Sequence, residues 1–148
     1  MVNVAMLGAS GRMGRTIVPL LHESSDLRLS GALAAADDGA VGQDAGVISG
    51  MAPVGVAVSS DPAQALAGAD VAIDFTLPAA SIANARLCAE RGCAMVIGTT
   101  GHDPMQRAEL EALATRIPIV LAPNMSLGVN LLIKLAELAA RALDEQYD

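Results

Sequence analysis

The fold of this chain is decided by the stretch Gly8-Ala9-Ser10-Gly11-Arg12-Met13-Gly14. An apolar run, Val2 to Leu7, precedes it, and an amphipathic segment, Arg12 to His22, follows it. This pattern predicts a strand that turns through glycines into a helix, whose first backbone N–H groups have no partner within the helix. Such a helix start binds the diphosphate of a dinucleotide. Ala9 stands where a first glycine often stands, so the stretch is a GxxGxxG variant of the dinucleotide fingerprint.

The individual residues of this stretch suit a nucleotide site. Gly11 would let the main chain approach a pyrophosphate closely, and Gly14 would let the helix pack tightly on the sheet. Arg12 and Arg15 place positive charge beside the helix start. The alternatives are a tight structural turn and, for Arg12, a solvated side chain, while the Met13 side chain is expected to pack in the core with its backbone lining the site. The cofactor-binding residues expected here are Gly8, Ala9, Ser10, Gly11, Arg12 and Met13.

Strands and helices alternate along almost the whole chain. Helices between successive strands imply right-handed crossovers and a parallel sheet that is covered on both faces. The sequence thus predicts one α/β domain over residues 1–148, with a Rossmann-like doubly wound sheet in the order 3-2-1-4-5-6. The expected strands are Val2–Leu7, Leu27–Leu33, Val54–Ser59, Val71–Phe75, Ala94–Ile97 and Ile117–Ala122. The expected helices are Arg12–His22, Pro62–Ala67, Ser81–Arg91, Pro104–Arg116 and Val129–Leu143, with a loop over 36–52.

The composition narrows the class of protein. A net charge of −7 argues against nucleic acid as a partner, because phosphates require a basic surface. No apolar run approaches about 18 residues, so no membrane span is expected. The N-terminus shows no basic region or signal-type cleavage site, which favours a cytoplasmic protein. Cys88 and Cys93, with His22 and His102, provide neither a disulfide framework nor a zinc set.

Three more turns follow expected strands. Because the carboxyl ends of parallel strands share one edge of the sheet, where ligands bind, we expect these turns to converge there with the glycine turn. The glycines of the turn at 98–101 would let the main chain touch a flat ring while its threonines orient that ring. The three turns are Asp74-Phe75-Thr76, Gly98-Thr99-Thr100-Gly101 and Ala122-Pro123-Asn124-Met125-Ser126-Leu127-Gly128-Val129-Asn130.

Structural roles remain as alternatives for several of these residues. The turn at 98–101 would also suit a loop with unusual backbone angles, and Asn124 and Ser126 would cap the last helix. Asp74 is expected to be a structural carboxylate at a strand end. His102 has no partner acid or nucleophile in the sequence and is expected on the surface. No Ser/His/Asp set, cysteine nucleophile or metal cluster can be assembled, so the sequence predicts a cofactor site without catalytic residues.

Together, the four motifs resemble the N-terminal domain of the dihydrodipicolinate reductase (4-hydroxy-tetrahydrodipicolinate reductase) family. The resemblance runs from Val2 to about Leu143 and rests on GASGRMG, IDFT at 73–76, GTTG at 98–101 and APNMSLGVN at 122–130. GTTG combined with APNMSLGVN is its most specific part. The family transfers a hydride from NADH or NADPH to a cyclic unsaturated imine dicarboxylate, on the bacterial route to diaminopimelate and lysine.

This resemblance implies a division of the cofactor site. The residues from Gly8 to Met13 would hold the diphosphate and the adenosine side. Phe75 and Thr76 would line the same cleft as a second tier. The domain would fix the C4 face of the nicotinamide against the substrate, which is positioning rather than acid–base chemistry. The residues lying against the nicotinamide and its ribose would be Gly98, Thr99, Thr100, Ala122, Pro123, Asn124 and Met125.

The adenosine side departs from the usual pattern. Dinucleotide folds place an acidic residue after the second strand to bind the ribose, and many of these reductases have an arginine beside it. This chain has Ala34 and Ala35 at those positions, with Asp37 and Asp38 a few residues later. Ala34 stays in the expected cofactor-binding set, while the preference between NADH and NADPH is left open.

A second departure concerns length. The family continues into a substrate domain that also builds a homotetramer, and these residues do not contain its paired-histidine motif or its anion-binding stretch. The chain is therefore expected to be a fragment of a longer protein, a monomer or weak dimer that binds the nicotinamide dinucleotide but has no reductase activity. The small dicarboxylate substrate would bind only to the full-length enzyme.

Two other functions compete with this one. A stand-alone dinucleotide sensor would use the same glycine turn without chemistry, although a sensor has no evident need for the run at 122–130. A related two-domain dehydrogenase acting on aspartate or homoserine would share the glycine turn but carry different later turns.

Overall fold

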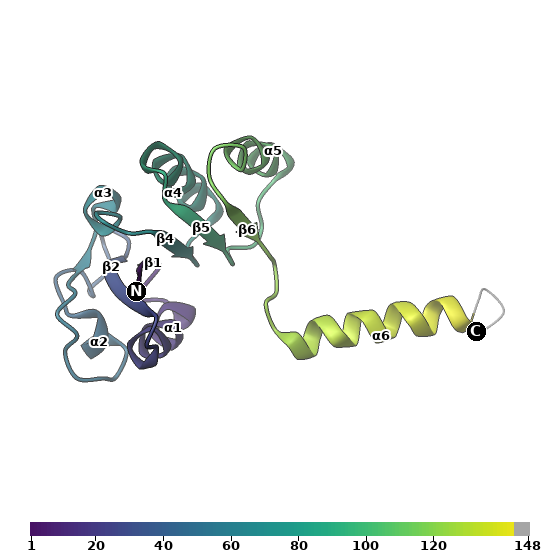
Figure 1. The fold of residues 1–148 in the computed structure, drawn as a ribbon, viewed down its shortest axis with the longest axis horizontal. Helices are drawn as coiled ribbons and strands as arrows, with labels where there is room; N and C mark the ends of the chain where they lie inside the picture. Colours follow the sequence, from purple (N-terminus) through teal and green to yellow (C-terminus); the bar gives the residue numbers. More distant parts are fainter. Residues whose placement is uncertain (144–148) are drawn as a thin grey trace.

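The computed structural model describes residues 1–143, and the last residues of the predicted domain, 144–148, lie outside this part. It contains the strands β1 (Val2–Leu7), β2 (Leu27–Leu33), β3 (Val58–Ser59), β4 (Val71–Asp74), β5 (Ala94–Ile97) and β6 (Ile119–Leu121). All neighbouring strands are parallel, and their order is β3-β2-β1-β4-β5-β6 (Figure 1). The predicted doubly wound sheet is confirmed.

Helices cover both faces of the sheet. They are α1 (Arg12–Glu23), α2 (Ala45–Ile48), α3 (Pro62–Ala65), α4 (Pro78–Arg91) and α5 (Pro104–Leu113), whereas the last helix, α6 (Leu127–Leu143), does not cover the sheet. One apolar layer packs beneath α1 and α2, and the other beneath α3, α4 and α5 (Figure 1). Successive side chains of β1 point to opposite faces, so Met6 belongs to the first layer while Ala5 and Leu7 belong to the second.

The two cysteines lie in the second layer. Cys88 and Cys93 are both buried, and both are free thiols. The hydrogen bond between their side chains, together with burial, raises the pKa of the Cys88 thiol. Cys88 is therefore a protonated core residue rather than a nucleophile.

Several helix ends are as the sequence predicts. The carboxylate of Asp61 accepts from the N–H of Ala63 (2.9 Å) at the start of α3. The carboxylate of Asp103 accepts from the N–H of Gln106 (2.8 Å) at the start of α5. A proline follows each capping residue at the first helical position, where its missing N–H costs nothing. Gly92 ends α4 with a φ of 69°, a left-handed conformation that favours glycine.

The region predicted as a loop over 36–52 contains the short helix α2, and β3 is shorter than the predicted strand Val54–Ser59. Asp44 explains both differences. Its carboxylate accepts from the N–H of Gly46 (2.8 Å) at the start of α2. It also accepts from the N–H groups of Val54 (3.0 Å) and Gly55 (2.8 Å), and these two bonds draw residues 54–55 away from the hydrogen bonds between β2 and β3. These hydrogen bonds, that of Val54 first, hold the pKa of Asp44 below its usual value.

The other predicted boundaries shift by a few residues. α4 begins at Pro78 rather than Ser81, because proline fits the first turn of a helix. α5 ends at Leu113 rather than Arg116, and α6 begins at Leu127 rather than Val129. Shifts of this size are ordinary for helix ends, which fray.

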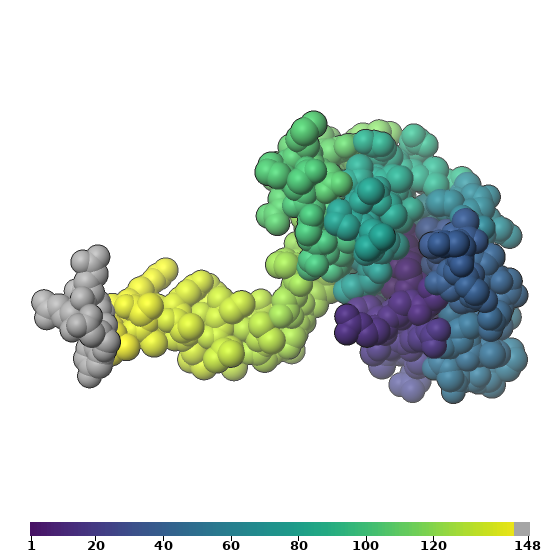
Figure 2. Space-filling view, turned by 180° about the vertical axis from the view of Figure 1, so that it is seen from behind, coloured from purple at the N-terminus to yellow at the C-terminus, as the bar shows by residue number. Residues whose placement is uncertain are grey.

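α6 extends away from the rest of the molecule as a rod, in both views of the fold (Figures 1 and 2). None of its residues is buried, so its apolar side chains are exposed along the whole helix. Its exposed apolar side chains include Leu131, Leu132, Leu135 and Leu138. Within the described residues, no helix combines the length and the apolar character that crossing a membrane requires.

A fully buried carboxyl group ties three elements together beneath the edge of the sheet. Asp74, at the end of β4, accepts hydrogen bonds from the hydroxyls of Thr99 (2.5 Å) and Thr76 (2.9 Å) and from the side-chain amide of Asn84 on α4 (2.9 Å). The Thr99 hydroxyl in turn accepts from the N–H of Thr76 (2.9 Å). This network agrees with the structural role expected for Asp74.

One glycine sets how closely α3 approaches the sheet. The β1–β2 register shifts between Val4 and Ala5, so that Ala5 pairs with Gly31. A Cβ on Gly31 would overlap the carbonyl oxygen of Ala65, the last residue of α3. The contact therefore requires glycine because of space and not because of an unusual φ.

We expect Gly31→Ala to lower the free energy of unfolding by about 2 kcal/mol or more, because α3 must move to admit the methyl group. Gly39→Ala is the matched control, since nothing lies within 4 Å of a Cβ there. Urea unfolding followed by circular dichroism compares the two variants. Equal losses of stability in both would contradict the packing described.

We expect Asp74→Ala to lower the free energy of unfolding by about 3 kcal/mol, because two buried donors, Thr99 and Asn84, and the partly buried Thr76 lose their acceptor. Asp74→Asn keeps one side-chain oxygen for the two threonines, and rotation of the Asn84 amide restores the third bond, so most of the stability should return. The same unfolding measurement tests both variants. An Asp74→Ala protein as stable as the parent would show that the network contributes nothing.

Candidate functional site

The turn between β1 and α1 is held between the ends of two neighbouring strands. The N–H groups of Gly8 and Ala9 both donate to the carbonyl oxygen of Leu33, the last residue of β2 (2.9 and 2.8 Å). Gly8 has a φ of 85°, and a Cβ on it would overlap the main-chain carbonyl of Phe75, just after β4. A Cβ on Gly14 would overlap the carbonyls of Gly8 and Ala9. The close packing of the turn thus requires glycine at both positions.

α1, which the structure describes in full, begins without a capping side chain. Its N-cap is Gly11, and its first turn contains no acidic residue. By contrast, Asp44, Asp61 and Asp103 cap α2, α3 and α5. The first N–H groups of α1 keep their capacity to donate, and the helix dipole adds partial positive charge. This helix start is suited to binding an anion.

The side chains around this helix start differ in placement. Arg15 donates from Nε to the carbonyl oxygen of Ser10 (2.9 Å), which holds its guanidinium beside the turn. The Arg12 side chain is exposed. The prediction that the Met13 side chain packs in the core is wrong: Met13, in the first turn of α1, is 44% exposed.

A first cavity, of about 440 Å³, lies beside the glycine turn. Its walls come from the turn itself, the end of β2, the residues after β4 and the helix α4. A volume of this size is typical of small-molecule sites. Among its lining residues are Gly8, Ser10, Gly11, Ala34, Asp38, Phe75, Thr76 and Asn84.

A second cavity, of about 450 Å³, brings together the turn after β5 and the run after β6. Its lining residues are Met13, Phe75, Gly98, Ala122, Pro123, Asn124, Met125 and Ser126. Five residues that the sequence assigned to one group, Gly98 and 122–125, therefore do line one cavity.

Phe75 borders both cavities and separates them. A Cβ on Gly98 would overlap the Phe75 ring, so this ring packs directly on the main chain of the turn after β5. The start of α1 also serves both cavities, since Gly11 lines the first and Met13 the second. The two cavities therefore lie next to each other along the sheet edge.

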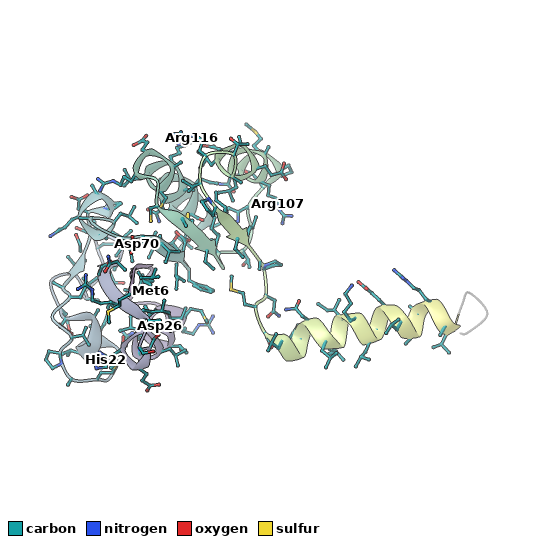
Figure 3. All side chains as sticks on the ribbon, in the orientation of Figure 1. Met6, His22, Asp26, Asp70, Arg107 and Arg116 are labelled. Carbon is teal, nitrogen blue, oxygen red and sulfur yellow. The ribbon has the colours of Figure 1, made fainter. Side chains whose placement is uncertain are left out.

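Thr99 and Thr100 line neither of these cavities but a third, of about 240 Å³, together with His102 and Arg107. The Thr99 hydroxyl is committed to Asp74. The prediction that His102 lies on the surface is wrong, since it is 7% exposed. Gly101 has a left-handed φ of 89°, and Arg107 (labelled in Figure 3) donates to the carbonyl oxygen of His102 (3.2 Å).

Two residues of the expected set line none of these three cavities. Ala9 is fully buried in the layer beneath α1, and Arg12 faces solvent. Ser126 caps α6, as its structural alternative predicts, whereas the Asn124 side chain binds the residue before the helix. Asn124 Oδ1 accepts from the N–H of Ser126 (2.8 Å), and Ser126 Oγ accepts from the N–H of Val129 (3.4 Å) at the start of α6.

The loop after β2 provides a carboxylate, that of Asp38, whose role the sequence left undecided. Ala34 is buried, Ala35 and Asp37 are exposed, and Asp38 turns back toward the glycine turn. The Ser10 hydroxyl donates to Asp38 Oδ2 (2.6 Å) and the N–H of Ala40 donates to Asp38 Oδ1 (2.8 Å). The hydrogen bond from Ser10, followed by that from Ala40, lowers the pKa of Asp38.

Side chains that could hold a metal are not grouped in this site. Over residues 1–143, no three His, Cys, Asp or Glu side chains come together as a metal site would require.

Known proteins match this chain over its whole length. The 4-hydroxy-tetrahydrodipicolinate reductase of Anaeromyxobacter sp. (strain Fw109-5) is 53% identical over 148 residues, which are 100% of this chain and 54% of that protein. The enzyme of the same name from Nitrosomonas europaea is 50% identical over 99% of this chain and 54% of its own length. The chain thus spans about half the length of the curated relatives it matches.

The fold agrees with that of a solved relative. Dipicolinate-bound dihydrodipicolinate reductase from Paenisporosarcina sp. TG-14 superposes with a TM-score of 0.76 at 28% identity, over 95% of this chain and 54% of that one. A putative oxidoreductase from Klebsiella pneumoniae shares the fold, with a TM-score of 0.63 at 24% identity over 95% of this chain and 40% of that one. The sequence family described as "Dihydrodipicolinate reductase, N-terminus" matches residues 2–125, and this chain belongs to that family.

Proposed function

We propose that this chain is the nicotinamide-dinucleotide-binding domain of a 4-hydroxy-tetrahydrodipicolinate reductase. One observation carries the proposal: two cavities of similar volume meet at Phe75, and the uncapped start of α1 contributes to both. A dinucleotide has the matching form, with two nucleoside halves joined by a diphosphate. The first cavity would take the adenosine half, the second the nicotinamide half, and the helix start the diphosphate.

The charge of the chain does not oppose this assignment. The net charge is −7, but charges on a distant surface are screened beyond about 8 Å at physiological salt. The N–H groups at the start of α1 act at contact distance. The guanidinium of Arg15, held against the carbonyl of Ser10, adds positive charge beside them.

The residues of the second cavity would position the nicotinamide ring. NADH or NADPH supplies the hydride, which passes to a cyclic unsaturated imine dicarboxylate in diaminopimelate and lysine biosynthesis. Apolar groups of Met13, Phe75, Ala122, Pro123 and Met125 would hold the ring and keep water from it. These residues would contribute by orienting the nicotinamide ring, and we assign proton transfer to none of the side chains that line the second cavity.

The substrate would need groups beyond this chain. None of the described residues that line the second cavity is a lysine or arginine, and a dicarboxylate requires such cations to bind. The parts of the relatives that this chain does not match would supply them. We place the full-length enzyme in the cytoplasm as a homotetramer, and residues 1–148 alone as a monomer or weak dimer.

Residues 1–148 should bind NADH saturably, with a Kd between micromolar and millimolar, roughly −8 to −4 kcal/mol. Gly11→Asp should weaken that binding by about tenfold or more, because the new carboxylate occupies the free N–H groups and repels the diphosphate. The same carboxylate is a good N-cap, so the melting temperature should stay equal or rise. Titration of NADH fluorescence, with thermal unfolding, measures both.

Met105→Asp is the matched control, since it adds the same charge at the exposed start of α5, outside the lining of the first and second cavities. Its Kd for NADH should equal that of the parent. An unchanged Kd in Gly11→Asp, or no saturable NADH binding by the parent, would contradict the proposed function.

The same polypeptide should show no reductase turnover, because none of the described residues that line the second cavity is a lysine or arginine that could bind the dicarboxylate. The assay follows NADH and NADPH absorbance with the cyclic imine substrate, at protein concentrations at which cofactor binding has been measured. Turnover well above the uncatalysed rate would show that these residues also bind and reduce the substrate.

A further inference from the structure

The first cavity contains a single charge. Among the described residues that line it, Asp38 alone is ionisable, and none is a lysine or arginine. The positions where this fold usually places its ribose-binding acid are Ala34 and Ala35. Asp38 therefore supplies a carboxylate to the same cavity from a later point in the loop.

The Asp38 carboxylate is fixed in place. Ser10 of the glycine turn donates to one oxygen (2.6 Å), and the N–H of Ala40 donates to the other (2.8 Å). A carboxylate offers about four acceptor positions, so each oxygen retains one. Asp38 is partly buried and does not need to rearrange before it accepts another hydrogen bond.

The carboxylate is also ionised at neutral pH. The hydrogen bond from Ser10 holds its pKa below the usual value, and the charge of Arg15 adds to the effect. A phosphate monoester carries a charge of about −1.5 to −2 at pH 7. Placed in a cavity that contains a fixed carboxylate and no basic lining residue, such a group would be repelled.

We propose that Asp38 selects the cofactor, accepting a hydrogen bond from the free ribose hydroxyls of NADH and repelling the 2′-phosphate of NADPH. The inference rests on the proposed function, since it assigns the first cavity to the adenosine half. It predicts that this chain prefers NADH although the usual acid is missing after β2.

The test compares three proteins, each titrated with NADH and with NADPH: the parent, Asp38→Asn and Asp37→Asn. Asp38→Asn keeps the shape and removes the charge: its one amide oxygen accepts from the N–H of Ala40, and its NH2 group donates to the Ser10 hydroxyl, which rotates to accept. Asp37→Asn removes the same charge from the neighbouring residue, which is exposed and lies outside the cavity lining. Thermal unfolding verifies that all three are folded.

The parent should bind NADH about tenfold or more tightly than NADPH. Asp38→Asn should bring that ratio to within about threefold, mainly by tightening NADPH, whereas Asp37→Asn should leave it unchanged. AMP and adenosine 2′,5′-bisphosphate should repeat the pattern, because they occupy the adenosine side only. Raising the salt concentration should reduce the ratio of NADH to NADPH affinity more in the parent than in Asp38→Asn, because salt screens the charge of Asp38.

Each other result has a defined meaning. An equal affinity of the parent for both cofactors, or a preference for NADPH, overturns the inference and leaves the proposed function standing. If Asp37→Asn changes the ratio of NADH to NADPH affinity as much as Asp38→Asn does, the effect is one of net charge, and the inference is also overturned. Binding of neither cofactor by the folded parent overturns the proposed function itself.

Discussion

The close contact of Gly8 with the strands on either side is the constraint on which this site depends. The turn after β1 hydrogen-bonds to the end of β2 through Leu33 and lies against the main chain of Phe75 after β4. Since β1 lies between β2 and β4 in the sheet, this one turn spans the point where the strand order reverses. A side chain at Gly8 would separate the turn from Phe75, the residue that borders both cavities.

Much of this architecture can be predicted because it follows from local chemistry. Alternating apolar runs and helix signals give six strands with crossovers, and the doubly wound order follows from that arrangement. Helix starts at Asp61 and Asp103 are readable since a capping side chain and the proline after it are neighbours in sequence. The grouping of Gly98 with residues 122–125 also holds, because both follow neighbouring parallel strands.

The features that escaped prediction depend on contacts between distant residues. The Ser10–Asp38 and Asp74–Asn84 hydrogen bonds carry no local signal, as each partner is an ordinary polar residue on its own segment. His102 looked like a surface residue because its burial depends on the tertiary packing of the segment between β5 and α5, which the local sequence does not show. The spacing of apolar residues likewise shows which positions are apolar, but it does not show that Met13, in the first turn of α1, is exposed.

The wall formed by Phe75 also bears on how a two-part ligand is recognised. A ligand with two linked binding halves gains from the linkage only when the linker spans the distance between the two subsites, and the gain falls steeply when it is too short. Here that distance is set by an aromatic ring seated on glycine main chain, which has no room to yield toward Gly98. For a dinucleotide bound as proposed, the wall would therefore act as a gauge of linker length, giving the second half a high effective concentration once the first is bound.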